Sequence, residues 1–103
     1  QGHVEIARLL LEAGAAVSQA RNNGVTPLFT ACQKGHLDVA RLLLEASAAI
    51  DQAAADGATP LFMACQVGRV EIVRLLIQAN AAVGQAAEDG TTPLFMACQE
   101  GHL

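Results

Sequence analysis

The chain has 103 residues, the size of one small domain, and its six basic and ten acidic residues give a formal net charge of −4. Hydrophobic residues make up 52% of the sequence, but Trp and Tyr are absent and Phe occurs three times, so the apolar character comes mostly from Ala and Leu. There is no basic patch and no platform of aromatic side chains, which argues against nucleic acid as a partner, and no apolar run of about 20 residues that would span a membrane.

A phrase of eight residues occurs three times at a constant spacing along the chain. The copies, 26–33, 59–66 and 92–99, all begin Thr-Pro-Leu-Phe and end Ala-Cys-Gln. A fixed period of about 20–50 residues indicates a repeat architecture, in which each unit packs only on its neighbours. Residues 23–55 and 56–88 are identical at 18 of 33 positions, so the period describes whole units.

In chain order, the first predicted element is a helix over residues 4–13, after a break at Gly2-His3. Its apolar residues recur at the spacing i, i+3, i+4, i+7, which is one face of a helix. The same pattern predicts helices over 37–46 and 70–79, each after a similar break. The apolar positions are Ile6, Leu9, Leu10 and Ala13 and their counterparts in the next two units.

The residue that follows each of these helices differs between the copies. Gly14 follows the first helix, at the position where a residue with a left-handed backbone ends a helix. Asn80 takes this position after the third helix at a greater cost, and Ser47, after the second, is a poorer choice. We therefore expect the exit at Ser47 to be the least well capped of the three.

Each unit also contains a predicted turn followed by a short helix. The turns, over 22–24, 55–57 and 88–90, contain Asn-Gly or Asp-Gly, which supply the positive φ angles of tight hairpins. Little β-branched alternation flanks them, so the β content is expected to be slight. The repeated phrase then begins a helix of about two turns, because its Thr suits the N-cap and its Pro the first helical position. Breaks at Gly35-His36, Gly68-Arg69 and Gly101-His102 end these helices.

The three cysteines, Cys32, Cys65 and Cys98, occupy the same position in successive units. Stacked helices lie about 8–10 Å apart, whereas a disulfide requires Cα atoms within about 7 Å of each other. We therefore predict buried free thiols that act as small apolar residues. Free thiols, together with a chain start that lacks the pattern of a signal peptide, indicate a reducing, cytoplasmic location.

Two of the cysteines are followed by histidine at i+4 spacing, as in some metal sites and thiol enzymes. Cys65, however, is followed at that spacing by Arg69, and a repeated ladder spreads ligands apart, whereas zinc requires four that converge. A thiol enzyme requires one nucleophile held against one base, which a residue repeated in every unit does not provide. The sequence therefore predicts no metal, no cofactor and no catalytic residue. The two pairs are Cys32 with His36 and Cys98 with His102.

The order Asn/Asp-Gly-x-Thr-Pro-Leu-x-x-Ala, then Gly-His-Leu/Val, then an apolar helix ending Leu-Leu-Leu-Glu-Ala-Gly-Ala resembles the ankyrin repeat. The resemblance covers Gly2 to Leu103 and implies a mostly α fold, an ankyrin-repeat solenoid of helix-turn-helix units joined by β-hairpin loops. Residues 1–103 then form a single array. Its parts are a partial repeat (1–22), two full repeats (23–55 and 56–88) and a second partial repeat (89–103).

One departure from the family pattern lies after Thr-Pro-Leu, where the family usually has His and this chain has Phe29, Phe62 and Phe95. The resemblance implies that the His ties adjacent units together through hydrogen bonds. Phe removes those bonds and adds buried apolar area. We expect a stack of Phe side chains between units, each stabilised by about 2–3 kcal/mol relative to exposure.

The resemblance also implies a non-catalytic protein–protein interaction module, an adaptor or scaffold whose concave face, built from hairpins and first helices, binds a partner protein of unknown identity. The positions that vary while the frame stays constant are the candidate contacts, although a free surface that has drifted would look the same. Met63 and Met96 either fill gaps or form an adaptable contact surface. The candidate residues are Arg21, Asn22, Asn23, Val25, Thr30, Lys34, Asp56, Ala58, Met63, Val67, Glu88, Asp89, Thr91, Met96 and Glu100.

The two ends of the chain suggest an alternative function. The chain starts with a second helix that lacks its first and stops after a first helix that lacks its second. Terminal units of repeat proteins usually have polar outer faces, but here apolar residues at both ends are expected to be partly exposed to solvent. The alternative is a structural unit that self-associates head to tail through these ends, or a piece of a longer array. The residues concerned are Ile6, Leu9 and Leu10 at one end and Leu94 and Phe95 at the other.

Overall fold

The computed structural model describes residues 2–101, and this range contains six α-helices and no strand. The longest helix has 11 residues, and none in the described range is long and apolar enough to cross a membrane. His102, which the sequence assigned to the last break, and Leu103 lie outside that range. The helices are α1 (Gly2–Glu12), α2 (Pro27–Lys34), α3 (Leu37–Glu45), α4 (Pro60–Val67), α5 (Val70–Gln78) and α6 (Pro93–Glu100).

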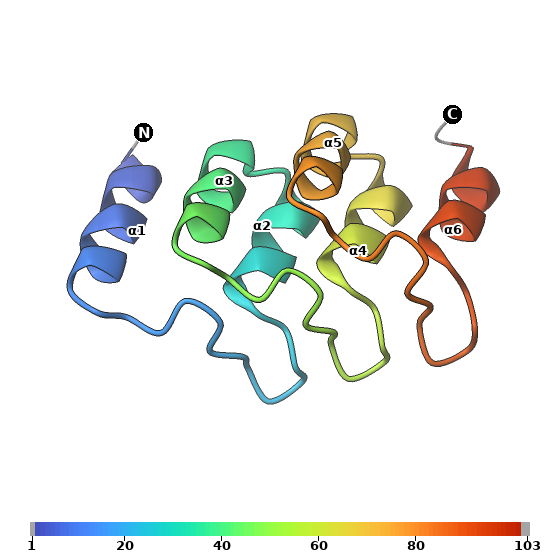
Figure 1. The fold of residues 1–103 in the computed structure, drawn as a ribbon, viewed down its shortest axis with the longest axis horizontal. Helices are drawn as coiled ribbons and strands as arrows, with labels where there is room; N and C mark the ends of the chain where they lie inside the picture. Colours follow the sequence, from blue (N-terminus) through green and yellow to red (C-terminus); the bar gives the residue numbers. More distant parts are fainter. Residues whose placement is uncertain (1, 102–103) are drawn as a thin grey trace.

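The helices form two rows, with α1, α3 and α5 in one and α2, α4 and α6 in the other (Figure 1). α2 packs on α4 and α4 on α6, while α1 packs on α3 and α3 on α5, so equivalent helices of successive units are neighbours. The result is an elongated stack of 40 × 26 × 20 Å. This is the helical solenoid that the repeat predicted.

The repeated phrase begins a helix in every unit, as its Thr and Pro predicted. The Thr hydroxyl oxygen accepts a hydrogen bond from the N–H of the Phe three residues later, at 3.1 Å in each copy. The Pro that follows the Thr lacks an N–H and therefore leaves no donor unpaired. Gly35, Gly68 and Gly101 then end these helices with left-handed backbones, at φ angles of 81°, 77° and 78°.

The second helices have the predicted apolar face but slightly different bounds. Each ends one residue before the predicted end, at Glu12, Glu45 and Gln78. α1 also begins at Gly2, so the predicted break at Gly2-His3 is wrong. No described helix precedes Gly2, so nothing requires the left-handed turn that Gly35 makes between α2 and α3.

All three second helices end in the same backbone motif. Gly14, Ser47 and Asn80 have φ angles of 95°, 70° and 70°. The next N–H donates to the carbonyl five residues earlier, at 3.0, 2.9 and 3.0 Å respectively. The expectation of a poorly capped exit at Ser47 is therefore wrong as regards hydrogen bonds. What distinguishes Ser47 from Gly14 is the cost of a left-handed backbone in a residue that has a Cβ.

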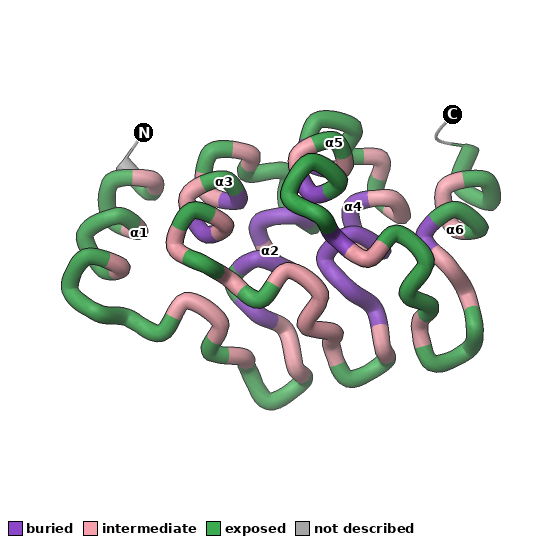
Figure 2. Tube along the Cα trace, viewed as in Figure 1, coloured by how far each residue is buried: buried purple, intermediate pink, exposed green. Residues whose placement is uncertain are grey.

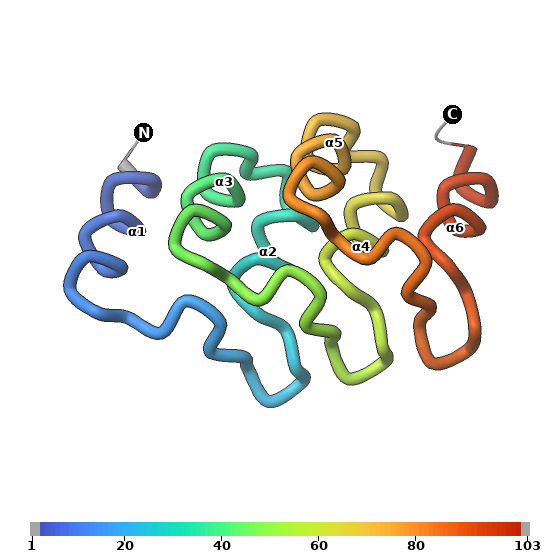
Figure 3. Tube along the Cα trace, viewed as in Figure 1, coloured from blue at the N-terminus to red at the C-terminus, as the bar shows by residue number. Residues whose placement is uncertain are grey.

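The loops between units are hairpins whose tips are bonded to one another. The N–H of Ala55 donates to the carbonyl of Asn23 at 2.9 Å, and the N–H of Glu88 donates to the carbonyl of Asp56 at 3.0 Å. A Cβ on Gly24 would lie 2.9 Å from the nitrogen of Ala55, so this contact requires glycine as much as the φ angle of 82° does. The hairpins consequently form a continuous series along one side of the stack (Figure 3).

The core lies between the two rows of helices and is most complete in the two full repeats (Figure 2). Leu28, Cys32 and Leu76 belong to its largest cluster and are at most 1% exposed. Burial declines toward both ends of the stack, where Leu9 is 62% exposed and Leu94 is 71% exposed. The apolar end faces predicted from the sequence are thus present on α1 and α6.

A second buried cluster joins the units near the hairpins. It consists of Phe29, Ala58 and Phe62, which are 5%, 2% and 7% exposed. The predicted apolar contact between units is therefore found for the first two Phe residues. Phe95 is 62% exposed, because no described element follows α6 to cover it.

Candidate partner-binding surface

All of the exposed candidate residues lie in two series that run along the stack. One series lies on the hairpins and the other at the ends of the first helices. We define the tip row as residues 21–23, 54–56 and 87–89, and the helix row as Lys34, Val67 and Glu100, the last residues of α2, α4 and α6.

Three side chains of the tip row form hydrogen bonds within their own hairpins. The Oδ1 atoms of Asn23, Asp56 and Asp89 accept hydrogen bonds from the backbone N–H two residues later, at 3.1, 3.0 and 3.0 Å. Hydrogen bonds from Thr91, chiefly its backbone N–H, hold the pKa of Asp89 below the ordinary value of 3.8. These three side chains therefore stabilise the turns. The exposed tip residues without such a bond are Arg21, Asn22, Ala55 and Glu88.

The helix row is exposed in all three units, with Val67 at 38%. One turn earlier on the same helices, Thr30, Met63 and Met96 are half-buried. Met63 and Met96 pack against the cluster of Phe29, Ala58 and Phe62. Of the two interpretations of these methionines, gap filling therefore has direct support in the packing.

Ala58 has to be removed from the candidate surface. It is 2% exposed and packs with Phe29 and Phe62, so its side chain is not accessible to a partner. Val25, in the same position one unit earlier, is half-buried and packs on the same cluster, and Thr91 is half-buried one unit later. Sequence variation at this position therefore accompanies burial between units and does not mark an exposed contact.

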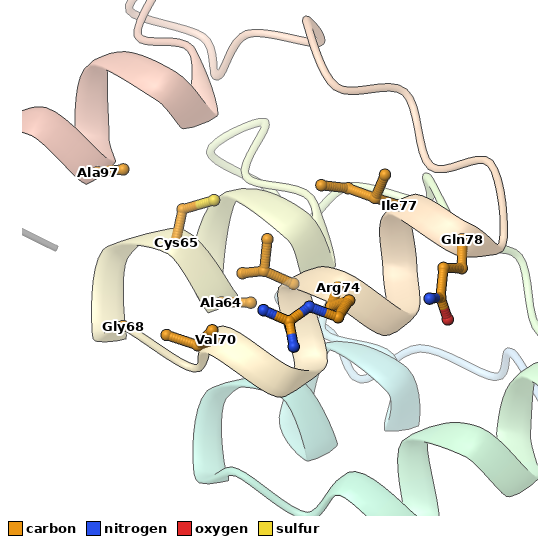
Figure 4. A pocket seen from close by; sticks show the side chains of 9 residues that line it. Ala64, Cys65, Gly68, Val70, Arg74, Ile77, Gln78 and Ala97 are labelled. Carbon is orange, nitrogen blue, oxygen red and sulfur yellow. The ribbon is translucent and has the colours of Figure 1, made fainter. Parts of the chain in front are cut away.

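A groove of about 380 Å³ lies between α4, α5 and α6 (Figure 4). Cys65 and Ile77 line it, and Ile77 is 49% exposed. In the preceding unit the equivalent residues, Cys32 and Leu44, are buried and half-buried, because α5 packs on α3 there. The groove therefore corresponds to the position that a further second helix would occupy in the stack.

Burial of the cysteines decreases along the stack. Cys32 is 0% exposed, Cys65 is half-buried and Cys98 is exposed, so the prediction of buried thiols is right for the first and wrong for the last. Burial raises the pKa of Cys32 to about 12 and also raises the pKa of Cys65. All three thiols are free.

The i+4 pairs of cysteine and histidine gain no support as metal sites. Cys32 is buried in the core, whereas His36 is exposed. His102, the partner of Cys98 in the second pair, lies outside the described residues. Within residues 2–101, no three His, Cys, Asp or Glu side chains are grouped so that they could hold a metal ion.

Two hydrogen bonds between units were not predicted from the sequence. The Oγ of Ser18 accepts a hydrogen bond from the N–H of Ala49, and the Oδ1 of Asp51 accepts one from the N–H of Ala82, both at 2.9 Å. Ser18 and Asp51 are separated by one full period of the repeat and therefore hold the same position in successive units. The third unit has Gly84 at this position, so the repeat did not mark it as a contact between units.

A further contact between units involves Arg69. Its Nε and Nη2 donate to the carbonyl oxygen of Gln33 at 3.3 and 3.1 Å. The guanidinium thereby places a positive charge at the C-terminal end of α2, where the helix dipole favours a cation. It also lies against Gly35, at a distance of 3.0 Å between its Cζ and the place where a Cβ would be.

Comparison with known protein families gives a match over the whole chain. A family model described as "Ankyrin repeats (3 copies)" matches residues 1–54 and 46–103. A search of curated proteins returned no significant match.

Proposed function

Because the chain belongs to the ankyrin-repeat family, we propose that it is a non-catalytic adaptor that binds a partner protein through the tip row and the helix row. Ankyrin repeats are generally protein–protein interaction modules. The proposal for this surface is supported by a backbone that is held in the same way in successive units, while the exposed side chains on it differ. The backbone bonds between Asn23 and Ala55 and between Asp56 and Glu88 fix the tips relative to one another, while the exposed side chains beside them differ from unit to unit.

The partner class is proposed to be protein, with neither nucleic acid nor membrane involved. The net charge of −4 opposes binding to the phosphates of nucleic acid. We also propose a reducing location such as the cytoplasm, which is supported by the three free thiols.

Photo-crosslinking tests the proposed surface. A photoreactive amino acid at Val67 or Ala55, both exposed, should capture a discrete partner from a lysate of the cells that express the protein. The matched control is the same amino acid at Glu45, which is exposed on α3 in the other row of helices. Equal capture at Glu45, or no capture at Val67 and Ala55, would overturn the proposal. Met63 and Met96 are unsuitable for this test because they pack on a buried cluster.

The apolar ends favour a second candidate function, a structural unit that self-associates head to tail. In α1, Ile6, Leu9 and Leu10 are 55%, 62% and 56% exposed. In α6, Leu94 and Phe95 are 71% and 62% exposed. The apolar face of α1 of one copy would then cover α6 of the next, and such contacts extend without closing. Sedimentation velocity tests this second function. A monomer at all concentrations rules out self-association, whereas oligomers that grow with concentration and that Leu9→Glu abolishes would support it.

A further inference from the structure

The charges of the tip row and the helix row change steadily along the stack. The formal charge of the two rows together is +2 in the first unit, −1 in the second and −3 in the third. Arg69 adds to the positive end, because its guanidinium bonds to Gln33, the neighbour of Lys34. The charged residues are Arg21 and Lys34 in the first unit, Asp56 in the second, and Glu88, Asp89 and Glu100 in the third.

These charges are available to a partner. Arg21, Lys34, Glu88 and Glu100 are all exposed. The ion pairs found within residues 2–101 lie elsewhere, on α3 and α5 in the other row of helices. These ion pairs therefore do not neutralise the charges of the tip row and the helix row.

The two ends of the gradient act on a partner separately. Helices of successive units pack about 10 Å apart, so the first and third units are separated by about 20 Å. This distance exceeds the Debye length of about 8 Å at physiological ionic strength, beyond which exposed charges are largely screened from one another. Between the ends, the side chains of Ala54, Ala55 and Val67 are small and uncharged and allow close approach.

We propose that the partner docks a segment whose charge order is acidic, then apolar, then basic, with the acidic end on the first unit and the basic end on the third. Such a segment has to span the two helix spacings between these units, about 20 Å. This inference rests on the binding function proposed above and adds the chemistry and direction of the bound segment. Complementary charge at both ends fixes the register of the segment and rejects the reverse order, because each end would then meet like charge.

Two synthetic peptides test the charge order, each of about 15 residues and therefore long enough to span about 20 Å even as a helix. The graded peptide has Glu in its first third, Ala and Leu in the middle and Lys in its last third. The control has the same composition with Glu and Lys alternating. We expect the graded peptide to bind about tenfold more tightly, because each of its ends meets opposite charge whereas the ends of the control meet charges of both signs.

Paramagnetic broadening of backbone amide signals gives the direction. A spin label on the acidic end should broaden signals near Lys34, and one on the basic end should broaden signals near Glu100. The variant Lys34→Glu with Glu100→Lys keeps the net charge and should lose the tenfold preference. The control exchange, Asp38→Arg with Arg41→Asp, has the same net charge on α3 and should retain it.

Three outcomes would overturn the inference. They are equal affinity of the protein for the two peptides, signal broadening that is the same whichever end carries the spin label, and no binding of either peptide. Binding at the tip and helix rows without a preference for charge order would leave the adaptor function standing. Failure of that function is detected separately, by the crosslinking at Val67 and Ala55.

Discussion

The carboxylate of Asp51 accepts a hydrogen bond at 2.9 Å from the N–H of Ala82, which lies 31 residues later in the next unit. Ser18 makes the same bond to Ala49 one unit earlier. In an array where each unit touches only its neighbours, a bond of this kind contributes directly to the coupling between units. The stack is therefore tied by polar contacts beside its loops as well as by the apolar core.

Asp51→Ala tests this contribution. The substitution leaves the half-buried N–H of Ala82 without its acceptor, and we expect a loss of about 1–2 kcal/mol in the free energy of unfolding. Asp51→Ser is the control, because Ser18 shows that a hydroxyl can accept the equivalent bond. Urea unfolding measures both. The interpretation is wrong if Asp51→Ala and Asp51→Ser lower the stability equally.

Ser47→Gly is expected to stabilise the protein by about 0.5–1 kcal/mol. Ser47 has a φ angle of 70°, which costs a residue with a Cβ about 1–2 kcal/mol, and glycine gives back part of this through its freer unfolded chain. Gly14→Ser is the reverse experiment, since Gly14 holds the same position at φ 95° and a Cβ there would meet nothing within 4 Å. Thermal unfolding should shift in opposite directions for the two variants, and shifts in the same direction would contradict this account.

The sequence predicted the features that depend on neighbouring residues. The N-cap of Thr26 and the turn at Gly24 follow from residue types within a few positions, so the pattern was sufficient. The bond between Asp51 and Ala82 spans 31 residues and its acceptor is Ser in one unit and Asp in the next. No local pattern signals such a contact.

The surface predictions failed where variation was taken for exposure. The position of Val25, Ala58 and Thr91 varies between units, yet its residues are buried or half-buried, and Ala58 belongs to the cluster that joins two units while Val25 packs on it. Conversely, Cys98 repeats a core residue but is exposed, because burial depends on whether another helix packs on α6. Repeat alignment identifies equivalent positions, but the burial of each one depends on its place in the stack.

The three thiols should react with a thiol-specific reagent at very different rates. Cys98 is exposed and should react first, followed by the half-buried Cys65. Burial raises the pKa of Cys32 to about 12, so almost no reactive thiolate is present at pH 8. Mass spectrometry of peptides from a labelling time course gives the order, with urea-unfolded protein as the control in which all three react. Labelling of Cys32 as fast as Cys98 in the folded protein would show that the core around α2 is open.

The hydrogen bonds of Asp89 predict a dependence of stability on acid. Hydrogen bonds from Thr91 lower the pKa of Asp89 in the folded protein below its ordinary value of 3.8. A pKa that is lower in the folded than in the unfolded protein stabilises the folded state. This stabilisation is complete above the pKa of the unfolded protein, about 3.8, and is lost as the pH falls from there through the pKa of the folded protein. Asp89→Asn keeps an acceptor, as Asn23 does in the first hairpin, but cannot ionise. The stability of the wild type relative to this variant should therefore decrease between pH 5 and pH 2, and a constant difference would contradict the assignment.

The last prediction concerns the Phe residues that replace the family's histidine. Phe62 is 7% exposed within the cluster of Phe29 and Ala58, whereas Phe95 is 62% exposed. Phe62→Ala should cost about 3–5 kcal/mol, the usual loss for removing a buried ring, while Phe95→Ala should change the free energy of unfolding by less than about 1 kcal/mol. If Phe62→Ala does not fold, Phe62→Leu provides a milder test.

The contribution of contact between units, rather than of burial alone, is measured by a double-mutant cycle. Phe29→Leu and Phe62→Leu should together cost an amount that differs by at least about 0.5 kcal/mol from the sum of the single losses, because the two rings belong to one cluster. Phe29→Leu with Phe95→Leu is the matched control, since Phe95 lies outside that cluster, and these losses should add. Additive losses for Phe29 and Phe62 would mean that each ring is stabilised within its own unit, and that the apolar replacement of the histidine does not couple the repeats.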